Sequence, residues 1–175
     1  MSLTRRLALG GGGGFLAAVL LRPALVLAAD PVEITMDGTA DGARVWFDPI
    51  GIHIQPGQSI RWINRDPGNS HTATAYHPDL WERPLRIPAG ATPWDSDYLL
   101  PEESFTVTLT EPGVYDYYCV PHEHAGMVGR IVVGTPAADF AFPPPDAGLE
   151  PLPDVALGNF PAVADILARG MVHRA

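Results

Sequence analysis

A cysteine, two histidines and a methionine stand close together in one short segment of the chain. The segment reads Tyr118-Cys119-Val120-Pro121-His122-Glu123-His124-Ala125-Gly126-Met127, and Cys119 is the only cysteine. A thiolate, imidazoles and a thioether are donors that mononuclear copper sites use, whereas a thioether is a weak ligand of zinc. A trigonal site of this kind changes its geometry little between Cu(I) and Cu(II). The segment therefore predicts one copper ion and one-electron transfer.

A fourth donor has to come from another part of the chain, and His71 is the best candidate. It follows the turn-forming stretch Asp66-Pro67-Gly68-Asn69-Ser70 and begins a segment rich in β-branched residues. Because a single cysteine cannot form an internal disulfide, Cys119 is free to act as a ligand. The second imidazole could come from His122 or from His124, which flank Glu123 on its two sides.

Short segments rich in β-branched and aromatic residues must position these donors. Gly, Pro, Asp and Asn separate the segments, and no long stretch of helical period precedes residue 135, so we expect an antiparallel β-sandwich or barrel. In the segment that ends at Cys119, side chains alternate, which places Cys119 at the inward-facing end of a strand. The expected strands cover residues 32–36, 43–47, 50–54, 58–63, 71–75, 104–110, 113–119 and 128–133.

The spacing Cys-x-x-His-x-x-x-x-Met, with Pro121 before the histidine and His71 upstream, resembles the type 1 blue-copper cupredoxins of the plastocyanin, pseudoazurin and halocyanin kind. Two further stretches are similar to hallmarks of that family. Residues 54–64 hold a Pro-Gly turn that leads into a strand ending in Asn, and residues 126–133 look like the closing strand. The resemblance covers residues 32–134 and implies an all-β, cupredoxin-like Greek-key antiparallel β-sandwich.

The resemblance also implies the ligand set and the activity. His71, Cys119 and His122 would be the equatorial ligands of one copper ion per chain, Met127 would be the weak axial ligand, and His124 would be an exposed neighbour. The implied activity is one-electron transfer between larger redox proteins, such as c-type cytochromes or membrane oxidoreductases, by a monomer that catalyses no reaction.

Two details of the resemblance concern residues beside the ligands. Family members such as plastocyanin usually have Asn after the upstream histidine, tying the two ligand loops together. Here the residue is Thr72, and we expect its hydroxyl to make a similar bond. In plastocyanin-like proteins a tyrosine beside the cysteine lies under an acidic docking patch, so Tyr118 and Asp116 are expected to mark a second electron route.

Other functions fit the sequence less well. Copper nitrite reductases and multicopper oxidases need a second copper centre with clustered histidines, and this chain has six histidines and one cysteine. A copper-binding carrier or chaperone without a physiological redox role stays open as the alternative. Nucleic acid is excluded as a partner because phosphate binding needs a basic surface, and the formal net charge is −9.

The N-terminus has the pattern of an export signal. Arg5-Arg6 precedes an apolar run over residues 7–21, and Ala28-Ala29 offers a cleavage region, so residues 1–29 are predicted to be a twin-arginine-type signal. The alternative is an uncut N-terminal tether. The expected location is the periplasm or the outer face of the cytoplasmic membrane, without stable membrane insertion after cleavage. Cleavage removes three of the 11 arginines, leaving eight against 20 acidic residues and a formal net charge of −12.

The C-terminal part differs from the rest in composition. Residues 30–134 are predicted to form the cupredoxin domain. Residues 135–175 are predicted to be a Pro/Ala-rich tail, because residues 136–153 are rich in Pro and Ala and include Pro143-Pro144-Pro145, a composition typical of an extended segment or linker. Within the tail, residues 162–169 followed by Gly170 have the start and stop signals of one short helix, which could dock on the domain or remain loose.

Overall fold

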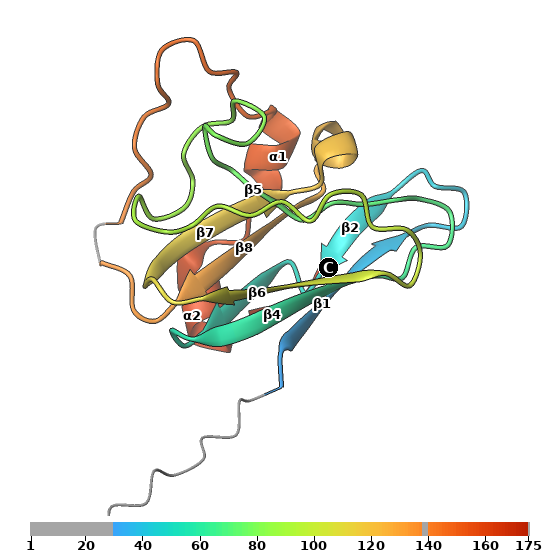
Figure 1. The fold of residues 1–175 in the computed structure, drawn as a ribbon, viewed down its shortest axis with the longest axis horizontal. Coiled ribbons are helices and arrows are strands. Elements are labelled where there is room, and N and C mark those ends of the chain that lie inside the picture. Colours follow the sequence, from blue (N-terminus) through green and yellow to red (C-terminus); the bar gives the residue numbers. More distant parts are fainter. Residues whose placement is uncertain (1–29, 138–139, 175) are drawn as a thin grey trace, which may run out of the picture.

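Two β-sheets pack face to face in the computed structural model, which describes residues 30–137 and 140–174 (Figure 1). The first sheet has the strand order β2-β1-β4-β6 and the second β5-β7-β8-β3-β9. The strands of the first sheet are β1 (Val32–Gly38), β2 (Val45–Asp48), β4 (Gln58–Asn64) and β6 (Ser104–Leu109). Those of the second are β3 (Gly51–Ile54), β5 (Thr74–Ala75), β7 (Gly113–Tyr118), β8 (Val128–Val133) and β9 (Met171–Val172). The all-β sandwich is therefore confirmed.

The core between the sheets is apolar and rich in aromatic rings. Trp62 from the first sheet and Tyr117 from the second are fully buried, and their rings meet edge to face with centroids 5.3 Å apart. The ring of Phe47 also meets that of Tyr117 edge to face, with centroids 4.8 Å apart. Such edge-to-face packing adds to the stabilisation from area burial. The rings hold the two sheets in register just below the end of β7, where Cys119 follows.

Two strand pairings are parallel, although the sequence predicted an antiparallel sandwich. β1 pairs with β4 and β3 with β8 in parallel, while the other ladders are antiparallel. The chain leaves the first sheet after β2, forms β3 in the second and then returns as β4. A crossover between sheets, unlike a tight hairpin, can bring the chain back in the same direction.

The segment around His71 is less regular than predicted. Residues 71–75 were expected to form a strand, but only Thr74 and Ala75 pair with β7. His71 instead forms a single antiparallel bridge with Leu99, in which the N–H of each residue donates to the carbonyl of the other. The long excursion after β5 therefore folds back along the His71 segment and fixes its backbone.

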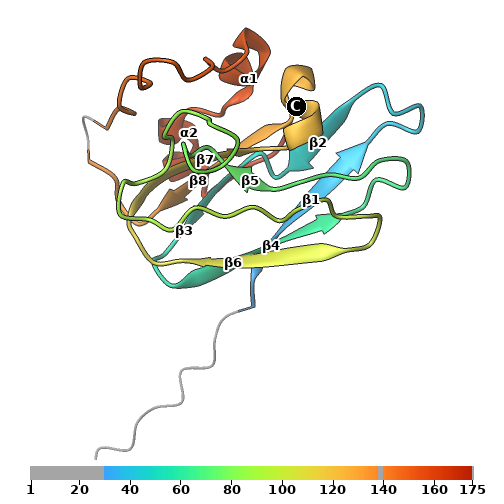
Figure 2. The same cartoon turned by 45° about the horizontal axis from the view of Figure 1, so that its top comes forward.

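The C-terminal segment lies against the side of the second sheet that faces away from the first (Figure 2). It contains α1 (Asp154–Asn159), α2 (Val163–Arg169) and β9, so α2 agrees with the predicted helix while α1 was not predicted. Ile166 of α2 is fully buried and packs on Gly51. A Cβ at Gly51 would lie 2.8 Å from both Ile166 and the ring of Pro161, so the C-terminal segment can pack this closely only on a glycine. No helix in residues 30–137 and 140–174 is long and apolar enough to cross a membrane, and the predicted export signal lies outside these residues.

Candidate metal centre

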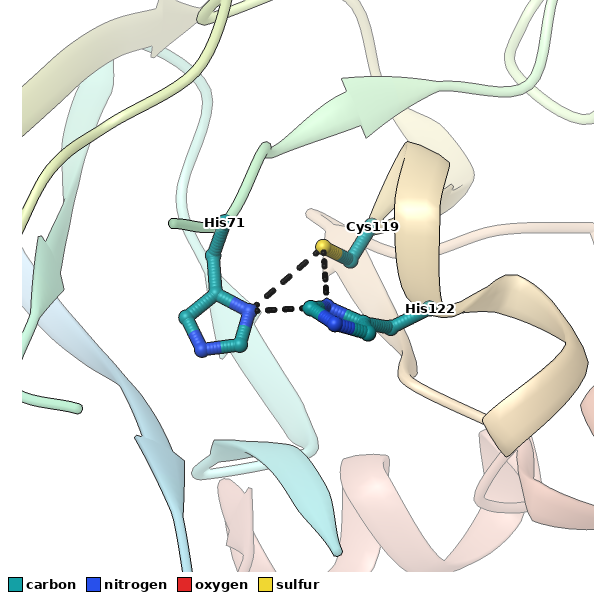
Figure 3. Close-up of side chains that lie close together, drawn as sticks. All are labelled: His71, Cys119 and His122. Atoms are coloured by element: carbon teal, nitrogen blue, oxygen red, sulfur yellow. Dashed lines mark hydrogen bonds between the residues drawn. The ribbon is translucent and has the colours of Figure 1, made fainter. Parts of the chain in front are cut away.

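Three of the predicted donors meet at one end of the sandwich (Figure 3). The Nδ1 atoms of His71 and His122 are 3.1 Å apart. The sulfur of Cys119 lies 3.6 Å from the first of these nitrogens and 3.4 Å from the second. His71 and Cys119 are fully buried and His122 is half-buried. One small triangle of two nitrogens and one sulfur can therefore surround a single ion.

A buried carboxylate fixes the orientation of His71. Its Nε2 lies 3.2 Å from Oδ2 of Asp66, and because a carboxylate can only accept, Nε2 carries the hydrogen and Nδ1 keeps its lone pair for a metal. Burial by itself raises the pKa of Asp66, but hydrogen bonds from Asn69, Gly68 and His71 outweigh it and hold that pKa below its usual value. Burial lowers the pKa of His71, which favours the neutral imidazole that a metal ion requires.

Cys119 is held as a buried thiol that a metal would deprotonate. Burial raises its pKa to about 12, against the opposing effect of a backbone hydrogen bond from Thr72. The Thr72 N–H donates to the sulfur at 3.3 Å, a bond that favours the thiolate. The hydroxyl of Thr72 accepts the N–H of Val120 at 2.8 Å, which confirms the expectation that this residue ties the two ligand loops together.

Met127 is brought next to Cys119 by the register of two strands. β7 and β8 pair so that Tyr118 lies opposite Val128, and the Cys119 N–H donates to the Met127 carbonyl at 3.0 Å. The Met127 N–H in turn donates to the His122 carbonyl at 3.1 Å. Met127 is fully buried in the same core cluster as Cys119, and its backbone hydrogen bonds join it to two of the three donor residues.

The two loop histidines differ sharply in their surroundings. Both belong to the short 3₁₀ segment η1 (Val120–Ala125), but His122 turns toward Cys119 whereas His124 is exposed. Burial lowers the pKa of His122, and the nearby His71 lowers it further. The imidazole of His122 therefore completes the triangle of donors, and that of His124 faces solvent.

The sequence reasoning missed a buried ion pair in the ligand loop. Glu123 is only 4% exposed, accepts a hydrogen bond from the Tyr76 hydroxyl at 2.7 Å and pairs with Arg83. It also missed Asn64, whose side-chain amide donates to the carbonyls of Asn69 and Leu99 at 2.8 and 2.9 Å. The role of Asp66 as the hydrogen-bond partner of His71 was not predicted either, although the turn of Asp, Pro, Gly and Asn just before the histidine was a signal for it. No local sequence signal identifies the partners of Glu123.

Tyr118 and Asp116, which were expected to mark a second electron route, are both buried and do not form an exposed docking patch. Tyr118 is 2% exposed, stacks on Tyr76 with centroids 4.3 Å apart and lies in a buried cluster with Leu152 from the C-terminal segment. Asp116 is completely buried and accepts hydrogen bonds from two arginines. Burial raises the pKa of the Tyr118 hydroxyl to about 12. These residues are therefore packing and ion-pair partners beneath the C-terminal segment.

The donor triangle is the right size for a single first-row metal ion. Bond lengths of about 2.0–2.3 Å from nitrogen and sulfur to a first-row metal place an ion among atoms spaced 3.1, 3.4 and 3.6 Å apart. The described residues contain one such group of side chains, namely His71, Cys119 and His122. A β-sandwich that carries a mononuclear site of two imidazoles and one thiolate at its end has the architecture of a small copper protein.

Comparison with known proteins agrees with this class. Residues 34–134 match the copper binding proteins of the plastocyanin/azurin family. Plastocyanin of Lactuca sativa is 37% identical over 98 residues, which are 55% of this chain and 94% of that one. Chloroplastic plastocyanin of Physcomitrium patens is 35% identical over 113 residues, and the match spans 62% of this chain but only 61% of the relative. The crystal structure of pseudoazurin from Methylobacterium extorquens AM1 has a TM-score of 0.48 at 27% identity, covering 62% of this chain and 79% of that one.

The chain belongs to the plastocyanin/azurin family. It is a cupredoxin, a blue-copper electron carrier with a single type 1 site, and not an enzyme. Family membership thereby confirms the predicted copper cofactor and the predicted electron-carrier activity. It also implies redox proteins as partners.

Proposed function

We propose that His71, Cys119 and His122 are the equatorial ligands of the copper ion and that Met127 is its weak axial ligand. The convergence of the two Nδ1 atoms and the sulfur within 3.6 Å of one another carries this assignment. Met127 is supported by its burial and by its backbone bonds to Cys119 and His122. A bound copper ion would supply a one-electron couple between Cu(I) and Cu(II).

The surrounding residues hold this site rigid and partly dry. Asp66 orients His71, and Thr72 bonds both the sulfur of Cys119 and the loop that follows it. Because these contacts involve buried groups, the donor positions are set before metal arrives, which suits a carrier that must change oxidation state with little rearrangement. Of the four proposed ligands only His122 is partly exposed, so we place the electron's entry and exit at its imidazole edge.

The location and the particular partners are part of the proposal. We propose that residues 1–29 direct export, that residues 30–134 form the copper domain and residues 135–175 its tail, and that the protein works in the periplasm or at the outer face of the cytoplasmic membrane. Its partners there would be c-type cytochromes or membrane oxidoreductases. The formal net charge of −12 without the signal would speed encounters with partners that carry a basic docking surface.

The visible spectrum of residues 30–175, loaded with Cu(II) and then reduced with ascorbate, tests the ligand set. An intense thiolate-to-copper band that disappears on reduction and returns on reoxidation is expected for ligation by Cys119. Stoichiometric copper without such a band would refute the assignment of Cys119.

The choice between the loop histidines is tested by a matched pair of variants. His122→Ala should abolish the intense band, because it removes one corner of the triangle. His124→Ala should leave the band largely intact, because that side chain is exposed. The opposite pattern would reassign the ligand to His124.

A further inference from the structure

The C-terminal segment lies outside the residues that match the family, yet it reaches the ligand loop. α1 packs beside η1 (Figures 1 and 2). The side-chain amide of Asn159, the last residue of α1, donates to the carbonyl of Gly126 at 2.9 Å. Gly126 directly precedes Met127, so the tail touches the loop between two of the proposed copper ligands.

The close approach of α1 depends on the glycine at position 126. Its φ of +78° lies in the left-handed region, which favours glycine. A Cβ at this position would overlap the amide nitrogen of Asn159 and come within 3.1 Å of Val155 Cγ2. The loop and the helix are therefore shaped to fit each other, and the hydrogen bond is a specific contact.

The contact from Asn159 fixes the peptide group that enters Met127. This planar unit contains the carbonyl of Gly126 and the N–H of Met127. The carbonyl accepts from Asn159 and, at 3.0 Å, from the N–H of Val128, and the N–H donates to the His122 carbonyl at 3.1 Å. Because both ends of the plane are bonded, the direction in which Met127 leaves the loop is restricted.

The His122 end of the ligand loop is held by Glu123, and the C-terminal segment that holds the Met127 end is itself bonded to the second sheet. Glu123 is held by Tyr76 and Arg83, which both lie in the long excursion after β5. The tail is secured by β9, which pairs with β3, and by Arg130, which donates to the Pro161 carbonyl at 2.9 Å. Asn159 is thus a fixed point for the Met127 end of the loop, as Glu123 is for the His122 end.

We propose that Asn159 is a positioning residue for the copper site and acts through the Gly126 carbonyl on the placement of Met127. The inference rests on the proposed ligand set. In a site with two imidazoles and one thiolate the axial ligand tunes the reduction potential. A contact that restricts where Met127 lies therefore contributes to the potential and to the retention of copper, although Asn159 does not itself reach the metal.

The test compares Asn159→Leu, which removes the donor at similar volume, with Asn159→Asp, which turns an acceptor toward the Gly126 carbonyl. Leu157→Ala is the matched control, because Leu157 lies in the same helix and is 47% exposed. For each copper-loaded protein we would measure the reduction potential, the visible and paramagnetic resonance spectra of Cu(II), and the rate of copper release to a chelator.

Both Asn159 variants are expected to shift the potential and the Cu(II) spectra beyond the change seen in Leu157→Ala. Copper release should be faster by about twofold to about tenfold, the range that corresponds to the loss of one neutral hydrogen bond. Potentials and spectra equal to those of the control would overturn the inference while leaving the ligand set intact. Absence of the intense band from the unmodified protein would instead refute the ligand set, so the two failures are distinguishable.

Discussion

The change Asp116→Asn is expected to lower the free energy of unfolding by about 3–5 kcal/mol, the range for breaking a buried ion pair. The carboxylate is completely buried. Its Oδ1 accepts from Arg130 Nε at 2.7 Å, and its Oδ2 accepts from Arg130 Nη2 at 3.0 Å and Arg86 Nε at 2.8 Å. Asparagine keeps the shape of the side chain, so the measured loss reports the charge and its hydrogen bonds.

The size of this loss in unfolding free energy depends on how well water could solvate Arg86 and Arg130 once the carboxylate is gone. Their side chains are 16% and 12% exposed, and the ring of Phe142 covers one guanidinium at 4.1 Å and the other at 5.8 Å. Hydrogen bonds to charged groups contribute about 1.5–3 kcal/mol each. Their sum is an upper limit, because partly exposed guanidinium groups regain some hydration. We therefore expect a value near the lower end, about 3 kcal/mol.

Denaturant unfolding of the copper-free protein at low and high salt measures this loss, with Glu111→Gln as the exposed control. A loss of about 3 kcal/mol corresponds to a fall in Tm of about 6–12 °C for a protein of this size. The loss should depend little on salt, because a buried pair is screened weakly. A loss below about 1 kcal/mol, or one that disappears in high salt, would refute the account of a buried charge.

Three further changes test packing and metal chemistry. Ile166→Ala should lower the unfolding free energy by about 2–5 kcal/mol in a denaturant titration, because the side chain is fully buried. The control Leu167→Ala changes a side chain that is 39% exposed and should alter the unfolding free energy by no more than about 0.5 kcal/mol. Equal losses would contradict the docking of α2. Gly129→Ala should cost about 1–3 kcal/mol by the same measurement, since its Cβ would overlap the Tyr117 ring, and unchanged stability would show that the ring can move aside. Burial raises the pKa of the Cys119 thiol to about 12 and lowers the pKa values of both triangle imidazoles. Copper binding above about pH 7 should therefore release one proton, from the Cys119 thiol. The apparent copper affinity, measured against a competing chelator, should rise about tenfold per pH unit. A copper affinity independent of pH would show that the thiolate forms without copper.

The sandwich and the donors were predictable because the signals for them are local. Alternation of apolar residues and well-marked turns predicted most strands to within two residues at each end. Cys119, His122 and Met127 come from one loop, so their spacing alone indicates that they can converge. His71 was a candidate because it follows a turn-forming stretch and begins a segment rich in β-branched residues.

The groups that support the donors were not predictable, because their partners are distant in the sequence. The sequence alone suggests that Glu123 is an exposed loop residue, whereas in the structure it bonds with Tyr76 and Arg83. The Pro-rich composition of the tail suggested a linker, since composition reports how a segment behaves alone. Docking depends on features elsewhere, such as the absence of a side chain at Gly51 and the free edge of β3 that pairs with β9.

The docked tail also bears on how electrons would leave the site. Tyr118 is the last residue of β7 and directly precedes Cys119, so it would be a short route outward if it were accessible. However, Leu152 and Ala156 of the tail pack in its cluster. Exposing a side chain of the size of Leu152 costs about 1.5–3 kcal/mol, so a partner that used the Tyr118 side would have to displace the tail against this cost. The partly exposed edge of His122 needs no such displacement. We therefore expect the acidic surface to guide encounters while the electron passes at His122, with the tail closing the alternative route.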